Sequence, residues 1–480
     1  MRIQFLSASL LALVACGGGS KSGGGATGPK PPPPPEIGTH TDIAQPGKGG
    51  APVAPKVEVS KDARADYKAA MDGFMTNEKG GWNESACRGS ADKFSAVSRE
   101  HNLVEAQFMV GLSLQRCGLD KDAESAYTQA THMKGDPAKI AMAVSGLGEI
   151  YYRRGQVDAA KQYWDTALKA TGKLVGAHIN EAVMDLEGMR KIGNAKDATW
   201  KKLEEDAKFH LSSALGVDTD SVDAYTNFGL VWMEGWQQNK NRLDLAKTLL
   251  DEAKKRNEKY APLQNAYGLY WMHKGSLNQA LQSFSAAVEA DPKFIEARIN
   301  AGQLTLNFRK YDTAKEMFSK AIELAPKNYD AVIGLGVALR GLNDFDGAEA
   351  QYMKAKGIDP KRGDAYFNLG VLYKDFRATK VNDPDPIKAL RGSQDMYKKA
   401  RDFFSQVQDK DADPSDKTEA KNNIGDCDKV VKQLDGAITS LQNAPKMPDS
   451  PPPAPTPAPG ATPPAGAGSA APAPAAAPGK

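Results

Sequence analysis

The chain has 480 residues, of which 41% are apolar and 25% are charged, proportions that support a folded core and argue against global disorder. Its length exceeds that of one compact domain and predicts several domains or one extended array. The 62 basic and 59 acidic side chains give a formal charge of +3, which excludes the basic excess typical of nucleic-acid-binding proteins, and the four cysteines are too few for a disulfide scaffold.

Residues 1–15 have the layout of a signal peptide. Arg2 supplies a short positive region, and the mostly apolar stretch that follows is too short to span a bilayer comfortably. The end of this stretch, Leu-Val-Ala before Cys16, resembles a bacterial lipobox. The resemblance implies a lipoprotein that is cleaved before Cys16 and carries diacylglycerol on the sulfur and an acyl chain, such as palmitate, on the amine. The alternative is an ordinary secreted protein with a cysteine near the cleavage site.

Several acyl chains make stable membrane anchoring expected, since each buried CH₂ contributes about 0.8 kcal/mol. Gly17 follows the cysteine, whereas Asp at that position retains a lipoprotein in the inner membrane in the usual bacterial sorting pattern. The lipobox resemblance therefore implies a protein that is anchored to the outer membrane through Cys16 and faces the periplasm.

Both ends of the chain are rich in glycine and proline. Residues 16–59 predict a tether, because glycine runs are flexible and the run of five prolines at 31–35 is stiff. A flexible coil of this length reaches about 35 Å root-mean-square. Residues 442–480 predict a disordered tail, since most residues there are Pro, Ala or Gly and none from 444 onward is Leu, Ile, Val or aromatic. A solvated tail without a role and a proline-rich ligand are the two interpretations of it.

Between these ends the sequence repeats. Pro292, Pro326 and Pro360 follow one another at intervals of 34 residues. A period of 34 residues with a proline closing each unit resembles the tetratricopeptide repeat, a helix–turn–helix unit. The units 261–294, 295–328 and 329–362 share a glycine in the first helix and an alanine, an aromatic residue and an alanine in the second. These residues are Gly268, Ala280, Phe284 and Ala287; Gly302, Ala314, Phe318 and Ala321; and Gly336, Ala348, Tyr352 and Ala355.

The pattern continues in both directions. Further units begin near residues 104, 141, 175, 222 and 363, a degenerate unit occupies 60–100, and 415–441 predicts a closing helix. The resemblance implies an all-α fold, a right-handed α-solenoid of about seven to eight units over residues 60–441 with a C-terminal capping helix. A globular helical bundle with coincidental periodicity is the alternative. Enlarged turns are expected at 191–201, 237–242 and 376–393, where loops on a regular scaffold often carry function.

Once the units are placed, two cysteines fall on neighbouring helices. Cys87 lies on the second helix of the degenerate unit, and Cys117 ends the first helix of the next. The periplasm is oxidising, so we expect a Cys87–Cys117 disulfide. The alternative is two small residues buried in the core. Cys427 has no evident partner and is expected to be packed.

Catalytic and metal-binding motifs are not recognisable in the sequence. None of the six histidines pairs with another at helical metal-ligand spacing, and the Gly-Ser-Lys segment in the tether lacks the strand and the glycine offset of a phosphate loop. We therefore expect no enzyme activity, no catalytic residue, no metal, no cofactor and no small-molecule substrate.

The resemblance implies that peptides or partner domains bind in the concave groove of the solenoid. Asparagine recurs there two residues before the glycine position or its equivalent, at Asn180, Asn227, Asn300 and Asn368. Each amide offers a donor and an acceptor, so an asparagine ladder could hold an extended peptide backbone. The alternative is that asparagine is simply common at this position. The ladder predicts that replacing Asn300 and Asn368 weakens partner binding without lowering the melting temperature.

Together these features predict a protein–protein interaction scaffold in a multi-protein envelope complex. The whole chain resembles the multi-repeat lipoproteins of bacterial envelope complexes, including the gliding-motility apparatus. Two alternatives remain open: an assembly factor for secretins, pili or β-barrels, similar to a pilotin or chaperone, and a regulator of a periplasmic cell-wall enzyme.

Overall fold

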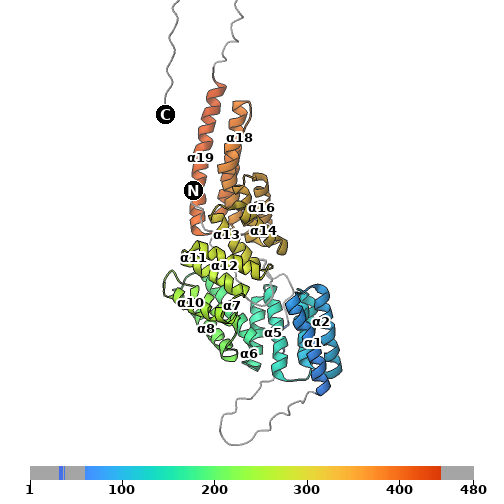
Figure 1. Ribbon diagram of the computed structural model, residues 1–480. Helices are drawn as coiled ribbons and strands as arrows, with labels where there is room; N and C mark the ends of the chain where they lie inside the picture. The colour runs from blue at the N-terminus through green and yellow to red at the C-terminus, as the bar shows by residue number, and fades with distance from the viewer. Residues whose placement is uncertain (1–31, 36, 38–59, 445–480) are drawn as a thin grey trace, which may run out of the picture.

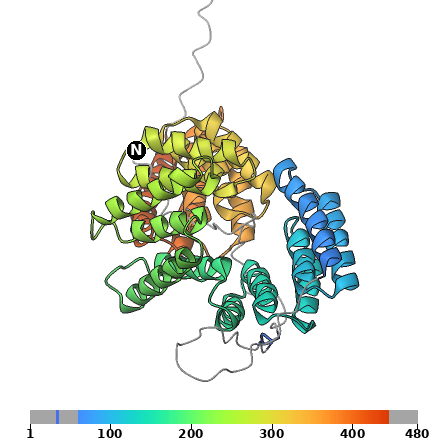
Figure 2. The ribbon, with the colours of Figure 1, turned by 60° about the horizontal axis from the view of Figure 1, so that its bottom comes forward.

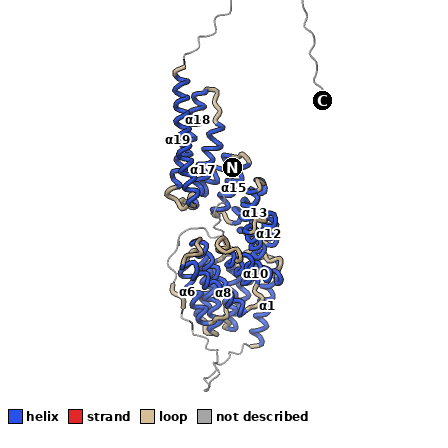
Figure 3. Tube along the Cα trace, turned by 90° about the vertical axis from the view of Figure 1, so that its left-hand side faces the viewer, coloured by secondary structure: helices blue, strands red, loops and turns tan. Residues whose placement is uncertain are grey.

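The computed structural model describes residues 32–35, 37 and 60–444. The predicted signal peptide, Cys16, most of the tether and the tail from residue 445 lie outside these described residues. Within them the regular structure is helical, and the β-type pairing is a single isolated bridge between Arg362 and Asp411 (Figure 3). None of the described helices combines the length and the apolar character needed to cross a bilayer.

The described helices follow one another as nine pairs and a final helix. The first of the nine is the degenerate unit that was expected near residues 60–100. The pairs are α1 (Lys61–Gly80) with α2 (Glu84–His101), α3 (Val104–Gln115) with α4 (Asp120–His132), α5 (Pro137–Arg153) with α6 (Val157–Ala170), α7 (Val175–Ile192) with α8 (Ala198–Val217), α9 (Val222–Met233) with α10 (Arg242–Arg256), α11 (Ala261–His273) with α12 (Leu277–Ala290), α13 (Ile295–Asn307) with α14 (Tyr311–Leu324), α15 (Tyr329–Gly341) with α16 (Phe345–Ile358), and α17 (Asp364–Val371) with α18 (Pro386–Val407). The final helix, α19 (Pro414–Gln442), packs along α18.

The pairs stack into a curved array. Figure 1 shows the chain rising from α1 and α2 to the long helices α18 and α19, and Figure 2 shows the first pairs following an arc. Odd-numbered helices of neighbouring pairs contact each other from α3 to α17, and no comparable contact joins the even-numbered helices of the described chain. The inner side of a curved stack is the shorter one, so the odd-numbered helices form the inner layer. The predicted all-α solenoid is thereby confirmed.

Small and large residues interlock within seven of the nine described pairs, as the repeat pattern predicts. A Cβ added at Gly268 would lie 2.3 Å from the Phe284 ring, so only glycine lets α11 approach α12 this closely. The same relationship recurs at Gly111 with Tyr127, Gly148 with Trp164, Gly229 with Leu250, Gly302 with Phe318, Gly336 with Tyr352, and Gly370 with Phe404. Each of these large side chains is at most 1% exposed. This repeated contact sets how closely the two helices of a pair approach each other.

Helix ends follow local sequence. The periodic prolines Pro292, Pro326 and Pro360 each stand two residues after an even-numbered helix, where proline's fixed backbone and missing N–H no longer disrupt it. Each odd-numbered helix from α3 to α15 turns into its partner through a residue with positive φ, usually glycine, as at Gly275 with φ 75°. In two pairs Arg309 and Asn343 take this conformation instead.

The enlarged turns differ from those expected, and the one expected at 237–242 spans residues 234–241 between α9 and α10. The first spans only residues 193–197, because Asp197 caps α8 by accepting hydrogen bonds from the N–H groups of Thr199 and Trp200. The region 376–393 was predicted as a loop, and that prediction is wrong for most of it. The inner helix continues from α17 through a π-helix, η1 (Leu372–Arg377), and a 3₁₀ turn, η2 (Ala378–Lys380), and α18 already begins at Pro386. The extra residues of this region therefore lengthen the helices of the α17–α18 pair and do not form a long loop.

The N-terminal tether also differs from a spacer that is free along its whole length. Pro32–Pro35 and Ile37 are seated on the array, where the Tyr163 hydroxyl donates to the Pro32 carbonyl oxygen at 3.0 Å. Ile37 packs against the hydrophobic core of the first pairs.

Candidate partner-binding surfaces

The four asparagines that the sequence singles out all lie on inner helices, in α7, α9, α13 and α17. Asn227 and Asn300 are each 1% exposed and Asn368 is 9% exposed, whereas Asn180 is half-buried. Inner helices pack against their partner and against the neighbouring pairs, so this position faces the interior of the stack. The structure does not bring the four residues together as one exposed ladder.

The amide groups of the buried asparagines are used within the protein. Asn300 Nδ2 donates to Asn265 Oδ1 at 2.8 Å, which joins α13 to α11. Asn227 and Asn368 each donate to the carbonyl oxygen four residues earlier, at 2.9 Å, and Asn368 Oδ1 accepts from Arg340 on α15 at 3.3 Å. Sequence reasoning missed Asn265, which is three residues before its glycine and not two. It is 35 residues from Asn300, one more than the repeat length, so a search at the exact period does not find it.

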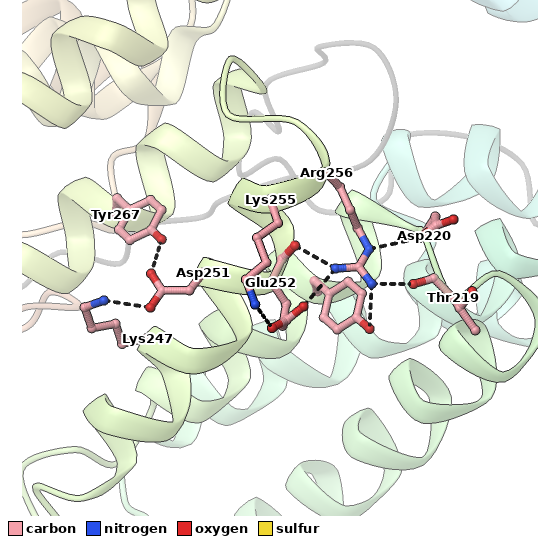
Figure 4. Close-up of polar contacts among 9 residues, drawn as sticks. Thr219, Asp220, Lys247, Asp251, Glu252, Lys255, Arg256 and Tyr267 are labelled. Carbon is pink, nitrogen blue, oxygen red and sulfur yellow. Dashed lines mark hydrogen bonds and ion pairs between the residues drawn. The ribbon is translucent and has the colours of Figure 1, made fainter.

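An extended polar network runs from the α8–α9 turn along one edge of α10 to α11 (Figure 4). Arg256 at the end of α10 stacks over the Tyr225 ring, with its guanidinium carbon 4.3 Å from the ring centroid. Its Nη2 donates to the Thr219 carbonyl oxygen at 3.0 Å, and its Nε donates to Asp220 at 3.3 Å. Arg256 also pairs with Glu252, one turn earlier, at 3.1 Å. One arginine thus holds the α8–α9 turn against α10.

The network continues along α10 towards α11. Lys247 pairs with Asp251 at 2.7 Å, and the Tyr267 hydroxyl donates to the same carboxylate at 2.6 Å. Burial alone would raise the pKa of Asp251, but these two hydrogen bonds outweigh it and hold the pKa below its ordinary value. Because each carboxylate in the network already accepts from a neighbouring donor, the edge is suited to presenting a fixed charge pattern to a partner.

Apolar side chains are also exposed on the even-numbered helices. Phe209 on α8 is 65% exposed, and Leu245 on α10 and Met353 on α16 are exposed by nearly half. Exposed aromatic and aliphatic side chains next to charged ones are typical of protein-contact surfaces. The sequence did not single out these positions, because a surface phenylalanine cannot be told from a core one until the helix has been oriented.

Two histidines that are 32 residues apart in sequence meet between α7 and α8. The Nδ1 atoms of His178 and His210 lie 3.0 Å apart, and His178 Nε2 lies 3.2 Å from the Gly172 carbonyl oxygen. That oxygen can only accept, so His178 Nε2 donates to it, and in the neutral pair the proton between the rings belongs to His210. Burial lowers the pKa of both rings. For His210, burial and then the neighbouring His178 lower the pKa to about 4.

Charged groups of α6 lie close to this histidine pair, since Lys161 and Asp165 act electrostatically on His210. Glu181 is fully buried and accepts from Lys161 at 2.9 Å. Burial, and then the neighbouring Glu181, raise the pKa of Asp185 to about 7. The stack assembles these groups from three helices, so no spacing rule within one helix could predict the cluster.

A second mixed cluster lies at the first pair. Asp66, Glu100 and His101 bring one ligand atom each within 4.8 Å of one another, and His101 Nε2 lies 2.8 Å from Asp66 Oδ2. Both carboxylates are exposed. The contact between His101 and Asp66 braces α2 against α1.

Cys87 lies on the helix that the repeat pattern predicted for it, and Cys117 lies just past the end of its predicted helix. Cys87 on α2 and Cys117 after α3 are joined by a disulfide. This bond ties the degenerate first pair to the second pair, and an ion pair between Arg116 and Glu78 at 2.8 Å lies beside it in sequence. Cys427 on α19 is a free thiol that is fully buried, and burial raises its pKa to about 11.

The comparisons with known proteins concern the repeat. Two family models described as tetratricopeptide repeat match residues 237–293 and 306–370. No curated protein matches the chain.

Solved structures of repeat proteins are also similar to the chain. A thermophilic TPR protein of Thermus thermophilus is 24% identical with a TM-score of 0.36, and the match covers 42% of this chain and 99% of that one. For Pseudomonas aeruginosa pilF the identity is 19%, the TM-score is 0.35 and the coverages are 48% and 92%. For the APC/C hetero-tetramer Cut9–Hcn1 the identity is 14% and the TM-score is 0.35, and the match covers 80% of this chain and 86% of that one.

Proposed function

The chain is a tetratricopeptide-repeat protein, and on that premise we propose that it is a lipid-anchored scaffold of the bacterial outer membrane that binds other envelope proteins along its array. The lipobox-like end of residues 1–15 and the position of Cys16 and Gly17 support the anchor. A multi-protein machine such as the gliding-motility apparatus is the kind of assembly in which we place it.

The observation that carries the scaffold proposal is the unbroken stack from α1 to α19. The same contact between a glycine and a large buried side chain recurs in seven of the nine pairs, so the interior is filled by closely packed side chains. What varies from pair to pair is the exposed surface. Side chains such as Phe209 and the charged α10 edge give that surface distinct local character. Repeat arrays of this kind offer extended binding surfaces, because each unit contacts only its neighbours and leaves its other faces free.

The anchor is tested by replacing Cys16 with Ala in cells. Loss of the lipid should move the protein from the membrane fraction to the soluble fraction, because the acyl chains supply the contact with the bilayer. A Ser20→Ala variant, close to Cys16 but outside the lipobox-like segment, should remain in the membrane. Retention of the Cys16→Ala protein in membranes would refute lipid anchoring.

Photo-crosslinking in cells tests the scaffold role. A crosslinking residue at Phe209 should capture the same envelope proteins in growing and in resting cells, at a constant ratio to the protein. Capture limited to the period in which a secretin, pilus or barrel is being built would instead identify an assembly factor. A purified partner whose enzymatic rate changes on mixing would identify a regulator.

A further inference from the structure

A short proline segment from the N-terminal part of the chain contacts a helix that is more than a hundred residues away in sequence. The Tyr163 hydroxyl on α6 donates to the Pro32 carbonyl oxygen at 3.0 Å. Figure 2 shows this segment as a short dark blue stretch beside the first pairs of the array. The contact is unusual because the rest of the described interior is built from helices packing on helices.

Tyr163 belongs to a pair of tyrosines, of which Tyr151 is 3% exposed and Tyr163 is 2% exposed with the segment in place. The rings of Tyr151 on α5 and Tyr163 on α6 have centroids 4.9 Å apart and are tilted by 59°. The Tyr151 hydroxyl donates to Glu124 at 3.1 Å, and Glu124 in turn pairs with Arg154 at 2.7 Å. These polar contacts hold the Tyr151 ring at its hydroxyl end, while the Tyr163 hydroxyl donates to the proline segment.

The segment makes contact at two points. Pro32 and Pro33 are exposed, whereas Pro34, Pro35 and Ile37 are half-buried. Ile37 packs against the hydrophobic core cluster that includes both tyrosines. The polar contact at Pro32 and the apolar contact at Ile37 together define the register of the segment on the array.

Proline-rich segments suit such a surface for physical reasons. The pyrrolidine ring fixes φ, so the segment loses little entropy on binding. An extended proline run has no internal hydrogen bonds, and its carbonyl oxygens are available to donors from outside. Tyrosine supplies both a flat apolar face for the ring and a hydroxyl donor, which is why aromatic-lined surfaces recognise proline-rich peptides.

We propose that the Tyr151–Tyr163 surface is a recognition site for a proline-rich peptide with an apolar anchor, and that residues 32–35 and 37 of the same chain occupy it. A partner with the same chemistry binds there only by displacing this segment. The proposal does not depend on the lipid anchor or on the scaffold role.

The test uses the full mature chain and a fluorescent peptide with the sequence of residues 29–38. In an opened variant, Pro32, Pro33, Pro34, Pro35 and Ile37 are all replaced by Ser, which vacates the site without touching a helix. The peptide should bind the opened variant at least tenfold more tightly than the wild-type protein, because a tethered copy competes at an effective concentration on the order of millimolar. Adding Tyr163→Phe to the opened variant should weaken binding by about three- to tenfold, since one hydrogen bond is lost.

Specificity is checked with a matched peptide in which the isoleucine is replaced by serine. It should bind the opened variant more weakly than the parent peptide, and equal binding would overturn the anchor role of Ile37. Failure of the parent peptide to bind the opened variant, or equal binding to both proteins, would overturn the proposal. A photo-crosslinker at Pro33 in the otherwise unchanged chain provides a second measurement. It should link to a peptide from α5 or α6, and a link elsewhere or none would also overturn it.

Discussion

Asn300 on α13 donates from Nδ2 to Oδ1 of Asn265 on α11, at 2.8 Å, inside the stack where both side chains are 1% exposed. The bond connects two successive repeats through their inner helices. It gives the recurring asparagine a structural role at this joint, where the sequence had predicted contact with a bound peptide.

Replacing Asn300 with Ala should therefore lower stability. The change leaves the buried Asn265 oxygen without its donor and removes packed atoms, so we expect a loss of about 1–3 kcal/mol in the free energy of unfolding. Urea denaturation followed by circular dichroism measures it. The exposed Asn278 on α12 gives a matched control, whose Ala variant should change stability by about 0.5 kcal/mol or less. An Asn300→Ala protein as stable as the wild type would show that the joint contributes nothing.

Replacing Gly268 with Ala should destabilise the array through overpacking. The added Cβ would lie 2.3 Å from the Phe284 ring, so α11 and α12 must move apart, at a cost of about 1–3 kcal/mol. Gly216 on α8 has no neighbouring atom within 4 Å of an added Cβ. Gly216→Ala should instead stabilise by about 0.5–1 kcal/mol, because alanine is the better helix former. Opposite signs for the two variants in thermal melts are the expected result, and equal signs would contradict the packing account.

Removing the disulfide should weaken the first pairs. A Cys87→Ser, Cys117→Ser double variant releases a constraint across a separation of 30 residues, which corresponds to about 3–4 kcal/mol in the chain-entropy model. Hydrogen exchange should rise mainly in α1, α2 and α3. A reductant should lower the stability of the wild-type protein and leave the double variant unchanged. If the reductant affects both proteins equally, the bond between these two cysteines is not the source of the effect.

Replacing Asp185 with Asn should stabilise the protein at high pH only. Burial and Glu181 raise the folded-state pKa of Asp185 to about 7, well above its ordinary value, so above pH 7 the folded protein holds a costly buried charge. As pH falls from about 7 towards 4, the folded state takes up a proton that the unfolded state does not, and the cost disappears. The variant should gain about 2–4 kcal/mol at pH 8 and lose this advantage by about pH 4.

The matched control for this pH dependence is Asp92→Asn on the exposed face of α2. Its stability relative to the wild-type protein should not vary in the same way across the same range of pH. A pH-independent gain for Asp185→Asn would mean that the charge of Asp185 is not what burial penalises.

Replacing Arg309 with Gly should stabilise the turn between α13 and α14. Arg309 has φ 55°, a left-handed conformation that glycine adopts at the equivalent turns of other pairs. Relief of this strain exceeds the entropy that glycine adds to the unfolded chain, so we expect a gain of about 0.5–1 kcal/mol. Asn343→Gly should give a smaller gain, because asparagine tolerates φ 65° better than arginine does. Chemical denaturation of both variants tests the order.

The sequence by itself determined the repeat. A proline every 34 residues and a glycine matched to a large side chain, as in Gly268 and Phe284, express local rules of helix ending and close approach that hold wherever the pair is placed. The helix pairs over residues 60–441 and the closing helix could be predicted for that reason. The boundaries of inserted segments could not, since Asp385 and Pro386 start α18 inside a stretch that lacks the repeat pattern.

Only the tertiary structure decided which faces are covered. Asn227 and Asn300 were expected to bind a peptide, but both side chains are 1% exposed because the neighbouring pairs close over them. Pro32 meets Tyr163 because the N-terminal segment returns to the array, and no local period relates these two residues. A repeat pattern encodes contacts within a unit and between adjacent units. What a side chain meets beyond these contacts depends on how the whole stack curves.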